Sequence, residues 1–170
     1  MNMPMDYANI VEKAVRKLIP KTFEYLDGSS KFGVENGYVI TCERTQSRRW
    51  FKEITDARQI GYTPDQKAVG IVERASKNSP IQGTQAYMVK EASVDMLDYI
   101  ERNNIDAGII MWVHDEWVIR LPKQARIKDN PGCTELSETL KDIALTACNK
   151  YLKNGLKMDA DYSINDTWVK

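Results

Sequence analysis

The sequence is poor in the residues from which most zinc and disulfide sites are built. Its 170 residues contain one histidine, His114, and three cysteines at widely separated positions. A single histidine excludes every site that needs two, such as the HExxH zinc centre. Three cysteines without a CxxC pair indicate a reduced, intracellular chain rather than a disulfide framework. A metal site here would consist mainly of carboxylates, which suit hard ions such as Mg²⁺.

Net charge and long apolar stretches are also absent. Lys and Arg together number 24, as do Asp and Glu, so the formal net charge is zero. This excludes a polycation that holds nucleic acid by bulk charge, but it does not exclude a local basic patch. No apolar run approaches the ~18–20 residues that span a bilayer, and the N-terminus lacks the regions of a signal peptide. We therefore expect a cytoplasmic protein with no membrane partner.

Hydrophobic periodicity predicts an α+β fold. One helix is expected over residues 7–27, kinked or split at Pro20 and broken at Gly28. Residues 55–66 are predicted to form a loop, and Pro80 is predicted to interrupt the next helical stretch. The other helices are expected at 64–77, 82–103 and 134–154, and the strands at 38–42, 49–51, 107–113, 117–121 and 156–163. Amphipathic helices against an antiparallel sheet make an α+β layer arrangement.

A short polar motif between two apolar strands is the sharpest local feature. The motif consists of His114, Asp115 and Glu116. The two strands that flank it are separated by so few residues that they can pair only as a tight hairpin, with the motif at or beside its turn. At a turn, unlike on a regular strand, both acids can converge on a divalent cation. Acids simply solvated in a turn fit the pattern equally well. A two-metal site would also need a carboxylate from another element.

Two further polar patches have side chains suited to nucleic acid. Arg74 and Asn78 share a helix face, and Gln82 follows at the start of the next predicted helix. Their donors match acceptors on base edges or phosphates. Arg48 and Arg49 lie beside two aromatic residues on the first predicted hairpin, a combination that can hold a phosphate backbone. From the residues alone, a solvated helix face explains the first patch better, and a solvated hairpin face explains the second equally well.

Taken in order, three stretches resemble the C-terminal part of DNA polymerase family A. Residues 37–49 are similar to its "GYV-T … GRR" hairpin, and residues 73–84 to its "ERA--N-P-QGT" segment. Residues 113–116 are similar to the "VHDE" of the third polymerase motif. The resemblance covers residues 10–170. It implies a palm-type antiparallel sheet with amphipathic helices packed on one face and a catalytic HDE motif at a hairpin turn.

The resemblance also implies a role for each residue of the HDE motif. Asp115 would be the palm carboxylate that binds the catalytic Mg²⁺ ions, and Glu116 the neighbouring acid that supports the metal site. His114 would lie by the primer terminus. The implied reaction is the transfer of a nucleotide from a deoxynucleoside triphosphate to a primer, with two metal ions.

Residues of the other two motifs would contact primer–template DNA. Arg74, Asn78 and Gln82 match family positions that touch the duplex, chiefly in the minor groove. Minor-groove acceptors vary little among correct base pairs, so contacts there test geometry without reading sequence. Arg48 and Arg49 of the hairpin would add contacts to the DNA.

Two parts of the family pattern are missing. The first-motif aspartate, which normally reads "DYS--E", and the nucleotide-binding fingers helix should both precede this region. Asp161-Tyr162-Ser163 copies the first motif but follows the HDE motif, so we interpret it as a decoy. We expect residues 1–170 to be a single partial domain, inactive alone and completed by an upstream polymerase chain that carries the remaining palm and the fingers.

Departures from the pattern favour a phage-type or split-gene member acting in a bacterial or phage-infected cell. One is Tyr87 at a position that is usually acidic, and another is the long hairpin turn over residues 43–47. Two alternatives remain. The chain is a non-catalytic DNA-binding module or degenerate polymerase remnant, or it is a nuclease that uses Asp115, Glu116 and Asp161.

Overall fold

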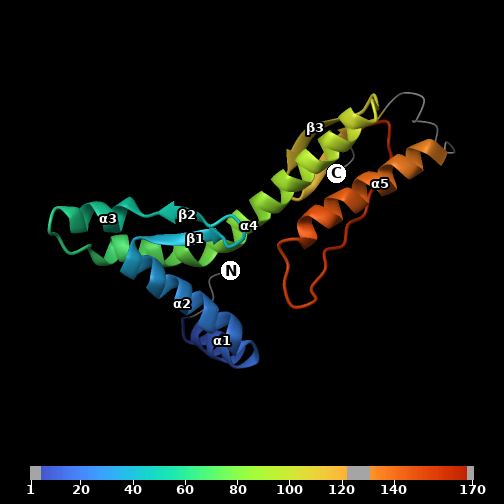
Figure 1. Ribbon diagram of the computed structural model, residues 1–170. Coiled ribbons are helices and arrows are strands. Elements are labelled where there is room, and N and C mark those ends of the chain that lie inside the picture. Colours follow the sequence, from blue (N-terminus) through green and yellow to red (C-terminus); the bar gives the residue numbers. More distant parts are fainter. Residues whose placement is uncertain (1–4, 122–130, 168–170) are drawn as a thin grey trace. The chain divides into compact units, whose positions relative to one another are not determined.

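The computed structural model describes residues 5–121 and 131–167 (Figure 1). The chain divides into two compact units, residues 1–84 and 85–170, and the boundary falls within one helix. The elements are α1 (Met5–Leu18), α2 (Pro20–Asn36), β1 (Tyr38–Cys42), β2 (Ser47–Trp50), α3 (Lys52–Gln59), α4 (Gln66–Arg102), β3 (Gly108–Val113), β4 (Glu116–Arg120) and α5 (Pro131–Asn149).

The predicted α+β class is confirmed. In the described part of the chain the strands form two separate two-stranded antiparallel sheets, β1–β2 and β3–β4, rather than one larger sheet. Cys42 and Cys148 are buried free thiols. None of the helices within residues 5–121 and 131–167 is long and apolar enough to cross a membrane.

Helices α1 and α2 confirm the predicted split at Pro20 but not the predicted break at Gly28. Helix α2 continues to Asn36 and ends at Gly37, which has a φ of 74° and donates its N–H to the Gly33 carbonyl at 2.9 Å. A Cβ on Gly33 would lie 1.9 Å from Ser76 Oγ of α4. Gly33, five residues after the predicted break, therefore makes a close helix–helix contact, which needs a residue without bulk.

Helix α3 occupies residues 55–59 of the predicted loop 55–66, whereas residues 60–65 are non-helical as predicted. Its apolar anchor is Ile54, which is 0% exposed in a core cluster with Val39, Phe51 and Val72. Arg58, near its C-terminal end, donates to the carbonyl oxygens of Glu35 and Val34 at 2.6 and 2.7 Å. These are carbonyls of the last turn of α2, which have no partner within their own helix. The segment is too short to show a clear helical periodicity in the sequence, and the contacts of Ile54 and Arg58 with distant residues stabilise the helix.

Helix α4 runs through Pro80 without interruption, so the predicted break there is wrong. Proline inside a helix costs about 3 kcal/mol or more because it removes one backbone hydrogen bond and crowds the preceding turn. Burial on both sides of the proline offsets this cost. Ser76 and Ser79 are 0% and 4% exposed before it, and Met88 and Ala92 are 8% and 0% exposed after it.

The second unit packs the C-terminal part of α4 against α5 and the β3–β4 hairpin (Figure 1). Its buried cluster has a regular spacing on each helix: Met88, Ala92, Met96 and Ile100 on α4, with Leu140, Ala144, Ala147 and Cys148 on α5. Lys150, just after α5, donates to Glu91 at 2.7 Å and to Asp95 at 3.2 Å. Hydrogen bonds to these two carboxylates raise the pKa of Lys150.

The predicted last strand, residues 156–163, is wrong. No strand follows α5 in the described residues, and this segment is held by isolated contacts. The Met158 N–H donates to Asn149 Oδ1 at 2.8 Å, and the Tyr162 hydroxyl donates to Glu138 at 3.0 Å. A strand needs a neighbour to accept its backbone hydrogen bonds, and neither sheet pairs with this segment.

Candidate functional site

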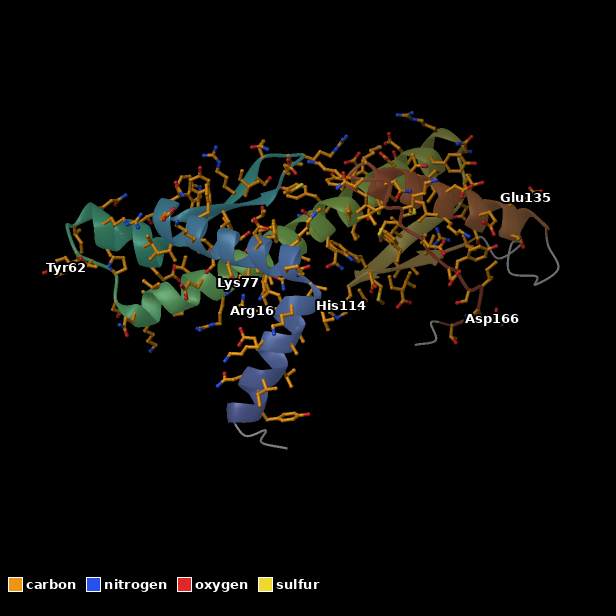
Figure 2. The ribbon with its side chains drawn as sticks, turned by 90° about the horizontal axis from the view of Figure 1, so that it is seen from below. Arg16, Tyr62, Lys77, His114, Glu135 and Asp166 are labelled. Atoms are coloured by element: carbon orange, nitrogen blue, oxygen red, sulfur yellow. The ribbon has the colours of Figure 1, made fainter. Side chains whose placement is uncertain are left out.

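The HDE motif lies at the turn of the β3–β4 hairpin. Val113 pairs with Glu116, so His114 and Asp115 alone form the connection between the strands. His114 has a φ of 57°, in the left-handed region that tight hairpin turns require. All three motif side chains are exposed, and Figure 2 labels His114 at this turn. The predicted antiparallel hairpin with the polar motif at its turn is confirmed.

Two tryptophans beside the motif hold the hairpin in place. Trp112 and Trp117 are cross-strand partners. The Trp112 indole N–H donates to the His114 carbonyl oxygen across the turn. The Trp117 indole N–H donates to Ser93 Oγ on α4 at 2.8 Å, and Ser93 Oγ donates to the Val89 carbonyl at 2.7 Å. The sequence reasoning did not assign Ser93 a role, although a serine on an otherwise apolar helix face was the available signal.

Replacing Ser93 with alanine is expected to loosen the hairpin. The substitution removes the acceptor of a partly buried indole N–H, a loss of about 1 kcal/mol in the free energy of unfolding. Val94→Ala is the matched control, because Val94 is 59% exposed and adjacent in sequence; its effect should stay within about 0.5 kcal/mol. Urea unfolding followed by circular dichroism measures both. Equal stability of the two variants would show that the Trp117 contact does not anchor the hairpin.

The acidic pair supplies only part of a metal site. Carboxylate oxygens are the donors that Mg²⁺ prefers, and Asp115 and Glu116 fit it in donor chemistry and accessibility. However, no group of three or more His, Cys, Asp or Glu side chains that could hold a metal exists among the described residues. Asp161 therefore does not join the pair, and the three-acid cluster of the nuclease alternative is absent there. A metal ion at Asp115 would need a further ligand from outside these residues.

The three predicted duplex-contact residues lie on one helix face in the first unit. Because α4 is continuous through Pro80, Arg74, Asn78 and Gln82 follow one another at intervals of four residues along a single helix. All three side chains are exposed. The sequence had placed Gln82 on a separate helix after the proline. The structure corrects this and makes the three residues one continuous row of donors.

The two hairpin arginines, adjacent in sequence, point to opposite faces of the β1–β2 sheet. Arg49 is opposite Val39, which is 2% exposed, and its Nη1 donates to Ser79 Oγ of α4 at 3.1 Å. Arg48 lies on the other face, with its guanidinium carbon 4.8 Å from the ring centroid of Tyr38. Neighbouring strand residues alternate between faces. Arg49 thus links the sheet to α4, whereas Arg48 remains at the surface.

Gly83 and Thr84 bring the sheet close to the end of the donor row. A Cβ on Gly83 would lie 2.6 Å from both the carbonyl oxygen and the Cβ of Thr41 in β1. Thr84 Oγ1 donates to the same carbonyl at 3.3 Å. Gly83 and Thr84 therefore pack α4 against β1. The sequence alone had shown them only as part of a motif that resembles a DNA-contacting segment.

A family model for DNA polymerase family A matches residues 1–170. The chain belongs to DNA polymerase family A. Its relatives include DNA polymerase I of Caldicellulosiruptor bescii, 35% identical over 107 residues that make up 63% of this chain and 12% of the relative. Another is DNA polymerase I of Geobacillus stearothermophilus, 28% identical over 123 residues, or 68% of this chain and 13% of the relative. The chain thus spans a small fraction of these family A polymerases.

A solved family A structure shows the same fold. The POL domain of Pol1 from M. smegmatis, in complex with a DNA primer-template and dNTP, aligns with 85% of this chain and 23% of its own. The TM-score is 0.70 and the sequence identity 19%. Within the family A chain described here, the row of donors lies in the first unit and the HDE hairpin in the second.

Proposed function

We propose that this chain is the C-terminal palm part of a DNA-directed DNA polymerase that acts in DNA replication. The observation that carries the proposal is the exposed HDE turn of β3–β4, in a chain that matches the family model along its whole length. The remaining palm and the fingers, with the first-motif aspartate, belong to the rest of the polymerase, on this polypeptide or on a separate upstream chain. That aspartate is the further metal ligand that the described residues lack.

In the proposed site, Asp115 would hold Mg²⁺ through its carboxylate and Glu116 would support the same region. His114 lies beside the primer terminus and orients it. Bound Mg²⁺ ions would supply stabilisation of negative charge on the attacking primer oxygen and on the departing pyrophosphate. The contacts of Trp112 and Trp117 keep the turn in a single position, which metal ligands need in order to act together.

Primer–template DNA and deoxynucleoside triphosphates are the proposed substrates. The row formed by Arg74, Asn78 and Gln82 faces the duplex and donates to minor-groove acceptors, which occupy similar places in all correct base pairs. This arrangement suits an enzyme that must accept any template sequence. The complex of the M. smegmatis relative with primer-template and dNTP supports the same choice of partners.

Replacing Gln82 with alanine is expected to weaken primer–template binding. Loss of one good hydrogen bond to the minor groove corresponds to about 1–3 kcal/mol, or roughly a 5- to 150-fold higher Kd. Gln59→Ala, an exposed glutamine at the end of α3, is the matched control and should leave the Kd unchanged. Fluorescence anisotropy with a labelled duplex measures both. If the two variants bind equally well, the α4 row is not the duplex-contact face.

A further inference from the structure

The outer face of the β1–β2 hairpin carries two aromatic rings and one arginine, and a third ring from α2 packs against it. Tyr38 and Trp50 are directly opposite in the strand register, with ring centroids 4.8 Å apart. Phe32 of α2 meets Tyr38 edge-on at 5.5 Å. The Arg48 guanidinium carbon lies 4.8 Å from the centroid of the same tyrosine ring. We call these four residues the ring face.

The ring face is not part of the hydrophobic core. Trp50 is 58% exposed and Phe32 is 39% exposed, whereas the next residue along from Trp50, Phe51, is 3% exposed in the core cluster. The alternation along the strand puts Val39 and Phe51 inward and Tyr38 and Trp50 outward. Trp50 and Arg48 both contact the ring of Tyr38, so the outward face presents exposed aromatic surface together with a cation to a partner.

We propose that the ring face binds the unpaired template strand next to the primer–template duplex, with one base stacked on Trp50 and the backbone phosphate beside Arg48. This inference rests on the proposed function, because a primer–template carries a single-stranded template extension. Every base has a π face, so stacking on an aromatic ring tolerates any sequence, as copying a template requires. Surfaces that bind single strands combine aromatic side chains for the bases with cations for the backbone.

Charge favours nucleic acid over a polypeptide as the occupant. Strands β1 and β2, with sequences YVITC and SRRW, contain two arginines and no acidic residue. Arg49 lies on the opposite face and donates to Ser79. Of the two strand arginines, Arg48 is therefore the one on the outer face. A polyanion pairs with that cation directly, whereas an apolar protein surface would leave it desolvated and unpaired.

The test compares three DNA ligands bound to the full chain. One is a blunt duplex, the second has a 5′ template overhang of six thymidines, and the third has an overhang of six abasic residues. The thymidine overhang is expected to lower the Kd about tenfold relative to the blunt duplex, and the abasic overhang much less. Trp50→Ala should abolish the gain from the thymidine overhang without changing the Kd of the blunt duplex, and Trp50→Phe should retain most of it.

Tyr62→Ala is the matched control, because Tyr62 is a 70% exposed aromatic residue outside the ring face. The inference is overturned if thymidine and abasic overhangs bind alike, or if Trp50→Ala and Tyr62→Ala behave alike. A change in oligomeric state with Trp50→Ala and no change in DNA affinity would identify a protein contact instead and also reject it. In both cases blunt-duplex binding leaves the proposed function intact. If no ligand binds, both the inference and the proposed duplex contacts fail.

Discussion

Asp115→Asn is expected to abolish primer extension by the assembled polymerase. Asparagine keeps the size of the side chain and removes the charge that Mg²⁺ requires. The rate should fall by about 10³-fold or more, equivalent to roughly 4 kcal/mol of lost transition-state stabilisation. A suitable assembled enzyme is a chimera in which this chain replaces the matching segment of the Caldicellulosiruptor bescii polymerase. Extension of a labelled primer under single-turnover conditions measures the chemical step.

Four controls make this result specific. Glu116→Gln should reduce the rate less than Asp115→Asn, since Glu116 has a supporting role. Asp161→Asn should have no effect, because that exposed aspartate belongs to the decoy motif and lies in no three-acid cluster of the described residues. Duplex affinity should be the same for all three variants, and residues 1–170 alone should not extend a primer. Near-normal extension by Asp115→Asn would reject the metal-ligand assignment and the proposed mechanism.

Gly83→Ala is expected to destabilise the first unit. The new Cβ would lie 2.6 Å from the carbonyl oxygen of Thr41, so backbone as well as side-chain atoms must move. Overpacking of this kind costs about 1–3 kcal/mol, and the better helix propensity of alanine offsets at most about 1 kcal/mol of it. We therefore expect a net fall of about 2 kcal/mol in the free energy of unfolding, measured by urea titration.

Gly28→Ala is the matched control for that substitution. Gly28 is also a helix-interior glycine, but a Cβ there would meet nothing within 4 Å. The same chemical change should therefore stabilise the chain by up to about 1 kcal/mol. Opposite signs for the two variants would show that Gly83 is required for the close approach of β1 to α4. A stabilising effect of Gly83→Ala would contradict the contact with Thr41.

Local signals were sufficient to predict the HDE hairpin. Two apolar strands separated by a few polar residues leave almost no geometry except an antiparallel pair with a tight turn. The left-handed His114 and the pairing of Val113 with Glu116 follow from that constraint. The α+β class and the split at Pro20 likewise depend on the order of elements and on proline sterics, which are properties of neighbouring residues. Catalytic roles for His114, Asp115 and Glu116 remain predictions.

The two predicted helix breaks failed for a long-range reason. Gly28 and Pro80 suggest helix breaks by propensity, and the contacts of Gly33 with Ser76 and the burial on both sides of Pro80 override them. Glycine and proline in a helix interior cost about 1–3 kcal/mol relative to alanine. The free energy of long-range packing can exceed this cost. No local pattern shows which segments will supply that packing.

Motif order and turn sterics can be recognised without long-range contacts, so the family, the α+β class and the placement of the acidic pair at a hairpin turn were predictable from the residues alone. Only the tertiary structure joined Arg74, Asn78 and Gln82 into one row, since their alignment depends on α4 continuing through a proline. Only the tertiary structure separated Arg49, bonded to Ser79, from Arg48 beside exposed rings. Both outcomes depend on contacts between residues far apart in the chain. Local propensity does not include the free energy of such contacts.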